Sequence, residues 1–178
     1  MPRTPTRAKD EASNRLRTRM LRGNSLDSAW RLNYIANFYT VPFYLALDRR
    51  IGISRAEYVI LFCVAQHPGT TAQEIVAASG RPKNSISVAV ANLERKRLIV
   101  RKQHGEDARC WEMHVTASGR AVYRKVMPLL RERERRMLAV LTPAERKRFD
   151  TLLLKVANSV SLWQEPDLSA LDDERRYR

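Results

Sequence analysis

The chain has 178 residues, of which 44% are hydrophobic, and it carries a net charge of +14. This composition excludes a wholly disordered chain and supplies enough apolar surface for one domain with helical extensions. The excess of basic residues favours a polyanionic partner such as DNA, RNA or an anionic membrane surface; a merely solvated basic surface is the alternative.

The two cysteines, Cys63 and Cys110, are too few for a disulfide framework, so we expect a protein of the reducing cytoplasm. The first 22 residues are charged and lack the apolar run of a signal peptide. The longest apolar stretch, residues 58–65, has the length of a buried helical segment and not of a membrane span.

Residues 1–23 form a basic arm in which Lys and Arg greatly outnumber Asp10 and Glu11. Few core-forming residues precede Leu16, so we expect a mobile arm that becomes helical at about Ala12. It would either contact DNA phosphates or serve as a solubilising tail.

Residues 26–50 contain six aromatic side chains and the apolar spacing of a helix. Pro42 removes one backbone donor, so we expect it to kink this helix or divide it in two. Asn24 or Ser25 should cap its start, and Gly52 should end it.

Three shorter helices are expected next. Capping boxes at Ser54–Glu57 and Thr71–Glu74 open the first two, which should end near Gln66 and Ser79. The third should run from Pro82 to about Lys96. Its inward face should carry four apolar residues at helical spacing: Ile86, Ala89, Val90 and Leu93.

The outward face of the third helix carries small polar, basic and aliphatic groups of the kinds that reach base edges in a DNA major groove. Asp and Glu are absent between Arg81 and Leu93, which suits a helix lying against phosphates. A helix-turn-helix pattern alone is only a moderate signal, because such helix pairs also occur in proteins that do not bind DNA.

A two-stranded ribbon should follow, from Leu98 through a turn at Gly105 and back to Val115. Asp107 and Arg109 are two residues apart, so the carboxylate can orient the guanidinium on one face of the strand. An oriented arginine at a hairpin tip suits a narrow minor groove. The alternative is an exposed ion pair of little energetic value.

Two further helices are predicted, from Thr116 to about Leu138 and from a cap at Thr142 to about Val160. The second of these combines the cap with a proline in its first turn and a capping box that ends at Glu145. The tail, residues 164–178, is polar and mixed in charge, and we expect it to be loose.

These segments together resemble the MarR family of winged-helix regulators. The resemblance rests on residues 65–71, on residues 86–99, on Arg101 with the wing residues 107–109 and 115–119, and on residues 141–145. It implies a mostly α fold with a small β-wing. Residues 51–116 would form a winged helix-turn-helix lobe that binds DNA, and residues 24–50 and 117–163 a helical dimerisation region.

The resemblance further implies a homodimeric transcription regulator, expected to be a repressor of a pseudo-palindromic operator whose half-sites lie about 34 Å apart. The residues expected to contact DNA lie on the third helix, on the turn after it and on the wing: Lys83, Asn84, Ser85, Ser87, Val88, Asn92, Arg95, Arg97, Lys102, Asp107 and Arg109.

Two of these residues depart from the family pattern. Val88 stands where the family often has a basic residue, and Arg97 stands where it commonly has glycine. Because glycine suits a left-handed helix cap, we expect the turn after the third helix to be built differently here. Arg97 would add a phosphate contact.

Family members often bind small aromatic acids in a cleft beside the DNA-binding lobe, so the resemblance also implies such an effector. An apolar pocket with a few polar anchors is the usual form of such a site. The candidate residues are largely aromatic and would otherwise pack in a dimer core: Trp30, Arg31, Tyr34, Tyr39, Phe43 and Tyr58.

Other functions remain as alternatives. The protein could be a non-specific architectural nucleic-acid-binding protein, or a redox-sensing regulator that uses Cys110, whereas Cys63 should be buried and inert. Cysteine and histidine lack metal-chelating spacing, so we expect no metal site and no cofactor besides the effector. No nucleophile–base constellation or phosphate-binding glycine loop is apparent, so we do not expect an enzyme.

Overall fold

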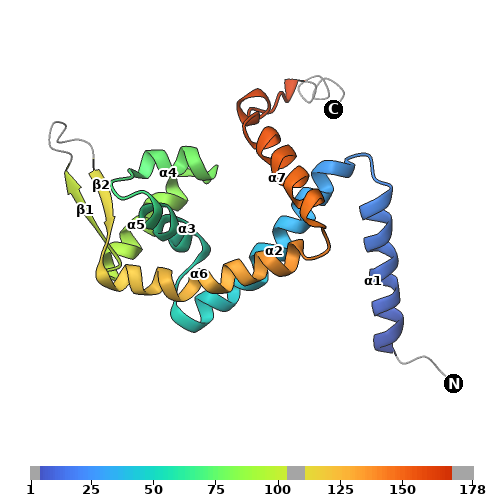
Figure 1. Ribbon diagram of the computed structural model, residues 1–178, viewed down its shortest axis with the longest axis horizontal. Coiled ribbons are helices and arrows are strands. Elements are labelled where there is room, and N and C mark those ends of the chain that lie inside the picture. The colour runs from blue at the N-terminus through green and yellow to red at the C-terminus, as the bar shows by residue number, and fades with distance from the viewer. Residues whose placement is uncertain (1–4, 104–110, 170–178) are drawn as a thin grey trace, which may run out of the picture. The chain divides into compact units, whose positions relative to one another are not determined.

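The computed structural model describes residues 5–103 and 111–169. The chain is mostly helical with a small two-stranded sheet, as expected (Figure 1). It divides into two compact units, residues 1–130 and 131–178, with the boundary inside α6. The elements in chain order are α1 (Pro5–Arg22), α2 (Asp27–Ile51), α3 (Arg55–Gln66), α4 (Ala72–Ser79), α5 (Lys83–Arg95), β1 (Ile99–Gln103), β2 (Trp111–Val115), α6 (Ala117–Leu138), α7 (Pro143–Ala157) and the short 3-10 helix η1 (Val160–Leu162).

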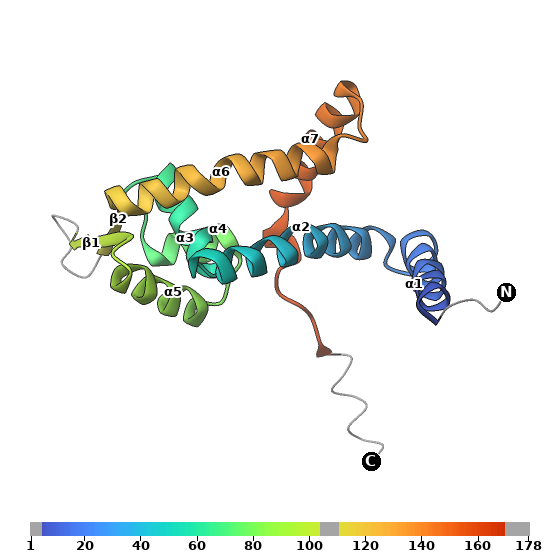
Figure 2. The same cartoon turned by 90° about the horizontal axis from the view of Figure 1, so that it is seen from below.

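The core of the first unit is built around α3, which contacts α2, α4, α5 and β2. Both ribbon views show α3, α4, α5 and the two strands gathered into one lobe (Figures 1 and 2). Tyr58, Ile60, Leu61 and Val64 of α3 are almost completely buried, which confirms the prediction that this apolar helix is central. Burial of their side chains is the main source of the lobe's stability.

Each of the three predicted capping boxes is present. In α3, the Ser54 amide donates to the Glu57 carboxylate over 2.7 Å, and the Glu57 amide donates to the Ser54 hydroxyl over 3.3 Å. Thr71 with Glu74 and Thr142 with Glu145 repeat this arrangement at α4 and α7. Because each box satisfies amides that the first turn leaves unpaired, these three helix starts could be read directly from the sequence.

Helix α2 departs from the sequence expectations in two ways. Its N-cap is Leu26 and not Asn24 or Ser25, because the Asn24 side chain instead accepts the Leu26 amide over 2.7 Å. Pro42 lies within α2, which continues across it as one helix and ends at a left-handed Gly52. Before α2, the basic arm forms helix α1 from Pro5, seven residues earlier than the expected start at Ala12.

The two strands pair antiparallel, with Ile99 opposite Val115 and Gln103 opposite Trp111. The turn before α4 joins this ribbon: the Gly69 amide donates to the Met113 carbonyl over 3.0 Å, and the Met113 amide donates to the Thr70 carbonyl over 3.1 Å. Residues 104–110, which include the predicted wing residues Asp107 and Arg109 and the thiol of Cys110, lie outside the described residues.

The second unit contains the last two turns of α6, then α7 and η1. None of the residues of α7 is buried within the chain, and apolar side chains such as Leu152 and Leu154 are more than half exposed. No helix in the described parts of the chain is both long and apolar enough to cross a bilayer.

Gly119 lies where the first turn of α6 meets the start of the ribbon. A Cβ atom at this position would lie 2.0 Å from the Leu98 carbonyl oxygen and 2.8 Å from Cγ1 of Val115. The Gly119 amide also donates to the Thr116 hydroxyl, which itself donates to the Arg97 and Leu98 carbonyls. The turn before β1 and the start of α6 are therefore in direct backbone contact.

Gly119→Ala is expected to lower the free energy of unfolding by about 3 kcal/mol, because the added methyl group meets backbone atoms that cannot move aside. Urea denaturation measures the effect. Gly23→Ala is the matched control, since a Cβ atom there meets only the Arg19 carbonyl at 3.9 Å. Equal stability of the two variants would contradict the close contact.

Candidate nucleic-acid interface

The two faces of α5 differ as the sequence predicted. Ile86, Ala89, Val90 and Leu93 are at most 4% exposed, and their side chains fix the helix onto α3 and α4. On the opposite face, Val88 is 62% exposed, and most of the neighbouring side chains are exposed as well: Lys83, Asn84, Ser87, Ala91 and Arg95. Because the apolar stripe is buried against the lobe, the predicted DNA-reading residues on the opposite face of α5 are exposed to solvent.

A shallow groove of about 360 Å³ runs between this face of α5 and the start of α3. Asn84, Ser85, Val88 and Asn92 line it from α5, together with the buried Ala89. Ser54 and Ala56 line it from α3. The structure thus brings four of the predicted base-reading residues together, and it adds a wall from α3 that the sequence pattern did not indicate.

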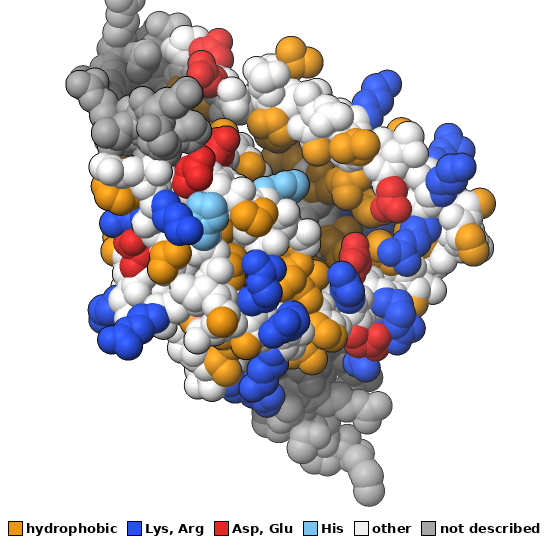
Figure 3. Space-filling view, turned by 60° about the vertical axis from the view of Figure 1, so that its left-hand side comes forward, with side chains coloured by type: hydrophobic (Ala, Val, Ile, Leu, Met, Phe, Trp, Pro, Cys, Tyr) orange, Lys and Arg blue, Asp and Glu red, His pale blue; other side chains and the backbone are white. Residues whose placement is uncertain are grey.

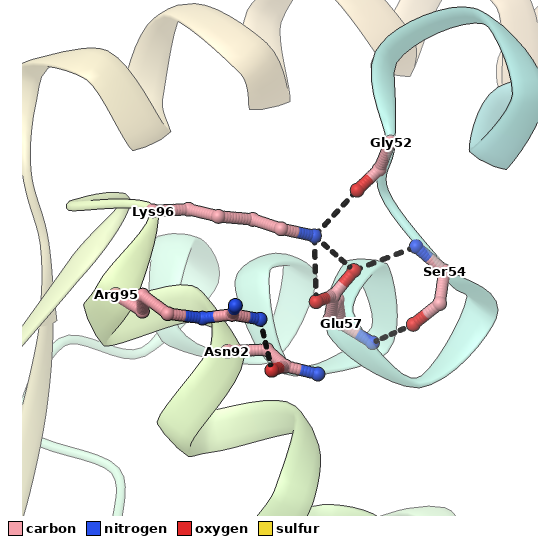
Figure 4. Close-up of polar contacts among 6 residues, drawn as sticks. All are labelled: Gly52, Ser54, Glu57, Asn92, Arg95 and Lys96. Carbon is pink, nitrogen blue, oxygen red and sulfur yellow. Dashed lines mark hydrogen bonds and ion pairs between the residues drawn. The ribbon is translucent and has the colours of Figure 1, made fainter.

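Two polar side chains on this face already have partners within the helix. The Ser87 hydroxyl donates to the Lys83 carbonyl over 3.1 Å, so its oxygen remains available as an acceptor. Nη2 of Arg95 donates to Oδ1 of Asn92 over 2.8 Å (Figure 4). An amide oxygen accepts two hydrogen bonds, so Asn92 can keep this partner while it pairs with an adenine edge.

The turn that follows α5 corrects one expectation. Arg97 has a φ of 56°, so the turn is left-handed even though glycine is absent. The Leu98 amide donates to the Leu93 carbonyl over 2.9 Å and the Arg97 amide to the Glu94 carbonyl over 2.8 Å, which together form a Schellman motif. Burial of Leu93 and Leu98 holds Arg97 in a backbone region that costs a side-chain-bearing residue roughly 1–2 kcal/mol.

The root of the wing is held against α5 by a bidentate ion pair. Arg101 of β1 contacts both carboxylate oxygens of Glu94, at 2.9 and 2.8 Å, and its guanidinium lies 5.6 Å from the Trp111 ring centroid. This ion pair neutralises the first acidic residue after the basic face of α5. Local spacing in the sequence does not indicate this ion pair, because Glu94 lies on α5 and Arg101 on β1.

The remaining predicted DNA contacts extend the basic surface. Lys102 is exposed on β1, and Arg97 is exposed at the end of α5. On the wing side of the molecule, Lys and Arg side chains are spread widely among apolar ones (Figure 3). Asp107 and Arg109 remain predictions from the sequence, since they lie outside the described residues.

The predicted ligand residues fall into two groups. Phe43 and Tyr58 join one aromatic cluster through Tyr44, whose ring centroid lies 5.4 Å from that of Phe43 and 6.2 Å from that of Tyr58. Trp30, Arg31 and Tyr34 lie in the first half of α2. There Arg31 pairs with Asp27 and donates to the Leu21 carbonyl of α1.

Tyr34, also in the first half of α2, packs against Phe38 with ring centroids 4.6 Å apart. Farther along α2, the Tyr39 hydroxyl donates to the Leu130 carbonyl over 3.5 Å. The role of these six residues in ligand binding stays a prediction.

Comparisons with known proteins agree with this geometry. A model of the MarR family matches residues 51–109, from the end of α2 into the wing. The chain is 24% identical over 108 residues to the HTH-type transcriptional repressor Rv2887 of Mycobacterium tuberculosis, a match that covers 61% of this chain and 78% of the repressor. A MarR/EmrR family transcriptional regulator from Acinetobacter has a similar structure, with a TM-score of 0.69 and 27% identity over 76% of this chain and 95% of that one.

The chain is similar to MarR-family regulators in both sequence and fold. This similarity confirms the winged helix-turn-helix fold predicted from the sequence and supports a role as a DNA-binding transcription regulator. The solved structure of Rv2887 in complex with salicylic acid shares the MarR fold, with a TM-score of 0.58 and 22% identity over 72% of this chain and 95% of that one.

Arg97→Gly tests the strained turn that follows α5. Glycine should raise the free energy of unfolding by about 1 kcal/mol, because it adopts the left-handed backbone without steric cost. Loss of the exposed cation should also weaken DNA binding and reduce the slope of log affinity against log salt by about 1. Urea denaturation and binding titrations at several salt concentrations measure the two effects.

Arg97→Lys is the control for this test, because it keeps both the charge and the backbone strain and should change neither quantity appreciably. A glycine variant that gains stability and binds DNA with an unchanged salt slope would show that Arg97 makes no phosphate contact.

Proposed function

We propose that the protein is a homodimeric repressor that binds a pseudo-palindromic duplex operator, with α5 in the major groove and the wing beside the minor groove. The outward face of α5 carries the proposal. It presents amide, hydroxyl and aliphatic groups along one groove, and residues 81–93 contain no acidic side chain to repel phosphates.

Apolar side chains exposed on the flanking helices support the homodimer. On α2, Leu32, Phe38 and Leu45 are 45–61% exposed, and α7 carries Leu152, Leu154 and Val156 with similar exposure. Monomeric proteins rarely leave so many large apolar groups in water, so each helix needs a covering surface. A second copy of the chain meets this need and would give the two-fold symmetry that a pseudo-palindromic operator requires.

A non-specific architectural role is the competing function, since a net charge of +14 alone would bind any duplex. The redox alternative finds no support at Cys63. This thiol is half-buried on α3, and burial raises its pKa, which disfavours the reactive thiolate. Cys110 lies outside the described residues.

Selection from a random duplex pool tests the proposal. We expect a motif of two half-sites related by two-fold symmetry and separated by about one helical turn. Asn92→Ala should then weaken binding to the selected duplex by about 1–3 kcal/mol and relax the preference at one base pair of each half-site. Competition assays measure both effects.

Asn14→Ala makes the same side-chain change on α1 and serves as the matched control. If selected and random duplexes compete equally at every salt concentration, the protein binds without specificity and the architectural role is correct.

We further propose that a small aromatic acid releases the repressor from DNA. The support is a polar, aromatic cluster among α2, α3 and the turn before α5. Tyr58 is 1% exposed, and neither its hydroxyl nor the buried Nε of Arg81 has a hydrogen-bond partner among the described residues. Arg55 lies 5.8 Å from the ring of Tyr44, which itself packs against Tyr58.

The cluster offers aromatic surface, the cations Arg55 and Arg81, and two donors, the Tyr58 hydroxyl and Nε of Arg81, that lack acceptors among the described residues. Such a site suits a ligand with an aromatic ring and a carboxylate. Burial raises the pKa of Tyr58, so its hydroxyl keeps its proton at neutral pH and can donate to such a ligand. The MarR-family protein Rv2887 has been solved in complex with salicylic acid. Salicylic acid is therefore the aromatic acid to test here.

Tyr58→Phe should leave the fold intact, because it removes a hydroxyl that makes no hydrogen bond within the described chain. The salicylate concentration that half-releases the operator should rise about tenfold, which corresponds to the loss of one hydrogen bond to a charged group. A salicylate titration of the protein–operator complex measures the shift.

Tyr34→Phe is the matched control, since it removes the same atom from the first half of α2. A rise in the salicylate midpoint for this variant, with none for Tyr58→Phe, would place the ligand at the other group of predicted residues. Equal midpoints for all three proteins would exclude both tyrosine hydroxyls as anchors.

A further inference from the structure

Lys96, the residue that ends α5, places its ammonium group among three oxygen atoms (Figure 4). Nζ lies 2.7 Å from Oε1 and 2.9 Å from Oε2 of Glu57, and it also donates to the Gly52 carbonyl. An ammonium group has three donors, so these contacts can use all of them. Neither residue was singled out as a partner of the other from the sequence, in which they lie 39 positions apart.

Glu57 is the buried partner of this ion pair, at 2% exposure, whereas the Lys96 side chain is 33% exposed. The Glu57 carboxylate also accepts the Ser54 amide in the capping box of α3. A carboxylate so far removed from water depends on its cation and on this amide for stabilisation, so the Lys96 side chain has little freedom to move away.

The contacts of Lys96 join the ends of three helices. Gly52 is the left-handed cap that ends α2, Glu57 belongs to the first turn of α3, and Lys96 ends α5. The same α2 carries the exposed apolar face proposed to form the homodimer. One side chain therefore connects the helix proposed to read DNA directly to the end of the helix proposed to hold the second copy.

We infer that Lys96 is a positioning residue that fixes the orientation of α5 relative to α2, and thereby the distance between the two half-sites that one dimer can read. This inference rests on the proposed homodimeric function. Lys96 itself is not proposed to contact DNA. Loss of the ion pair should therefore affect the tolerance for half-site spacing more than it affects the recognition of one half-site.

Operators with altered spacing provide the test. Starting from the selected motif, one or two base pairs are inserted or deleted between the half-sites, each of which changes their separation by about 3.4 Å and their relative rotation by about 34°. The wild-type protein should prefer one spacing by at least tenfold.

The Glu57→Gln, Lys96→Met double variant removes both charges together and leaves no unpaired buried ion. Its preference should fall to within about threefold, with single-half-site affinity unchanged within twofold.

The single variant Lys96→Arg should keep most of the spacing preference, because a guanidinium retains the positive charge and the contact with Glu57. Circular dichroism and thermal unfolding establish that each variant is folded, so a loss of spacing preference without a loss of structure supports the positioning role.

Two results would overturn the inference, and they are distinguishable. A folded double variant with the wild-type spacing preference would show that Lys96 does not set the half-site distance, while the dimeric function stands. A wild-type protein that binds every spacing equally would remove the proposed two-fold operator itself, and the inference with it.

Discussion

The structure of the DNA-binding lobe depends on how the last turn of α5 is held in place. Buried Leu93 and Leu98 close the turn from inside, and the Lys96 ammonium ties it to Glu57 on α3. On the opposite side, the Thr116 hydroxyl donates to the Arg97 and Leu98 carbonyls. A helix that reads base edges must present its side chains at a defined angle, and this turn fixes that angle from two directions.

The electrostatics of the lobe follow from the same turn. Two acidic residues near this turn form ion pairs: Glu57 pairs with Lys96, and Glu94 pairs with Arg101. Their charges are thus compensated within the protein, and the exposed cations of α5 and β1 set the sign of the surface. The ion pair of Glu94 also joins the root of the wing to α5, so the two proposed DNA-contacting elements share one support.

Local patterns in the sequence predicted much of this fold. The capping boxes at Ser54, Thr71 and Thr142 and the buried stripe of α5 depend on residues three or four positions apart, so short windows reveal them. The left-handed Arg97 could not be predicted in this way, because tertiary burial overrides the local preference for glycine.

In the candidate site, too, local sequence patterns predicted only the features that depend on nearby residues. The exposed face of α5 that is proposed to read bases followed from helical spacing. The pairing of Lys96 with Glu57 and the α3 wall of the groove depend instead on how distant segments pack. Residue types and spacing carry no information about which distant charges meet. Five of the six predicted ligand residues lie along α2, where Trp30 and Tyr34 are in the first half and Phe43 is in the second, and Tyr58 of α3 joins Phe43 through Tyr44.

The contact at Gly119 has a mechanical consequence. A rotating joint needs clearance between its parts, and here the first turn of α6 lies against the Leu98 carbonyl without room for a methyl group. The start of α6 therefore cannot pivot or slide against the turn that follows α5. A displacement of either one must carry the other as a single rigid body, and any bending has to occur farther along the α6 helix.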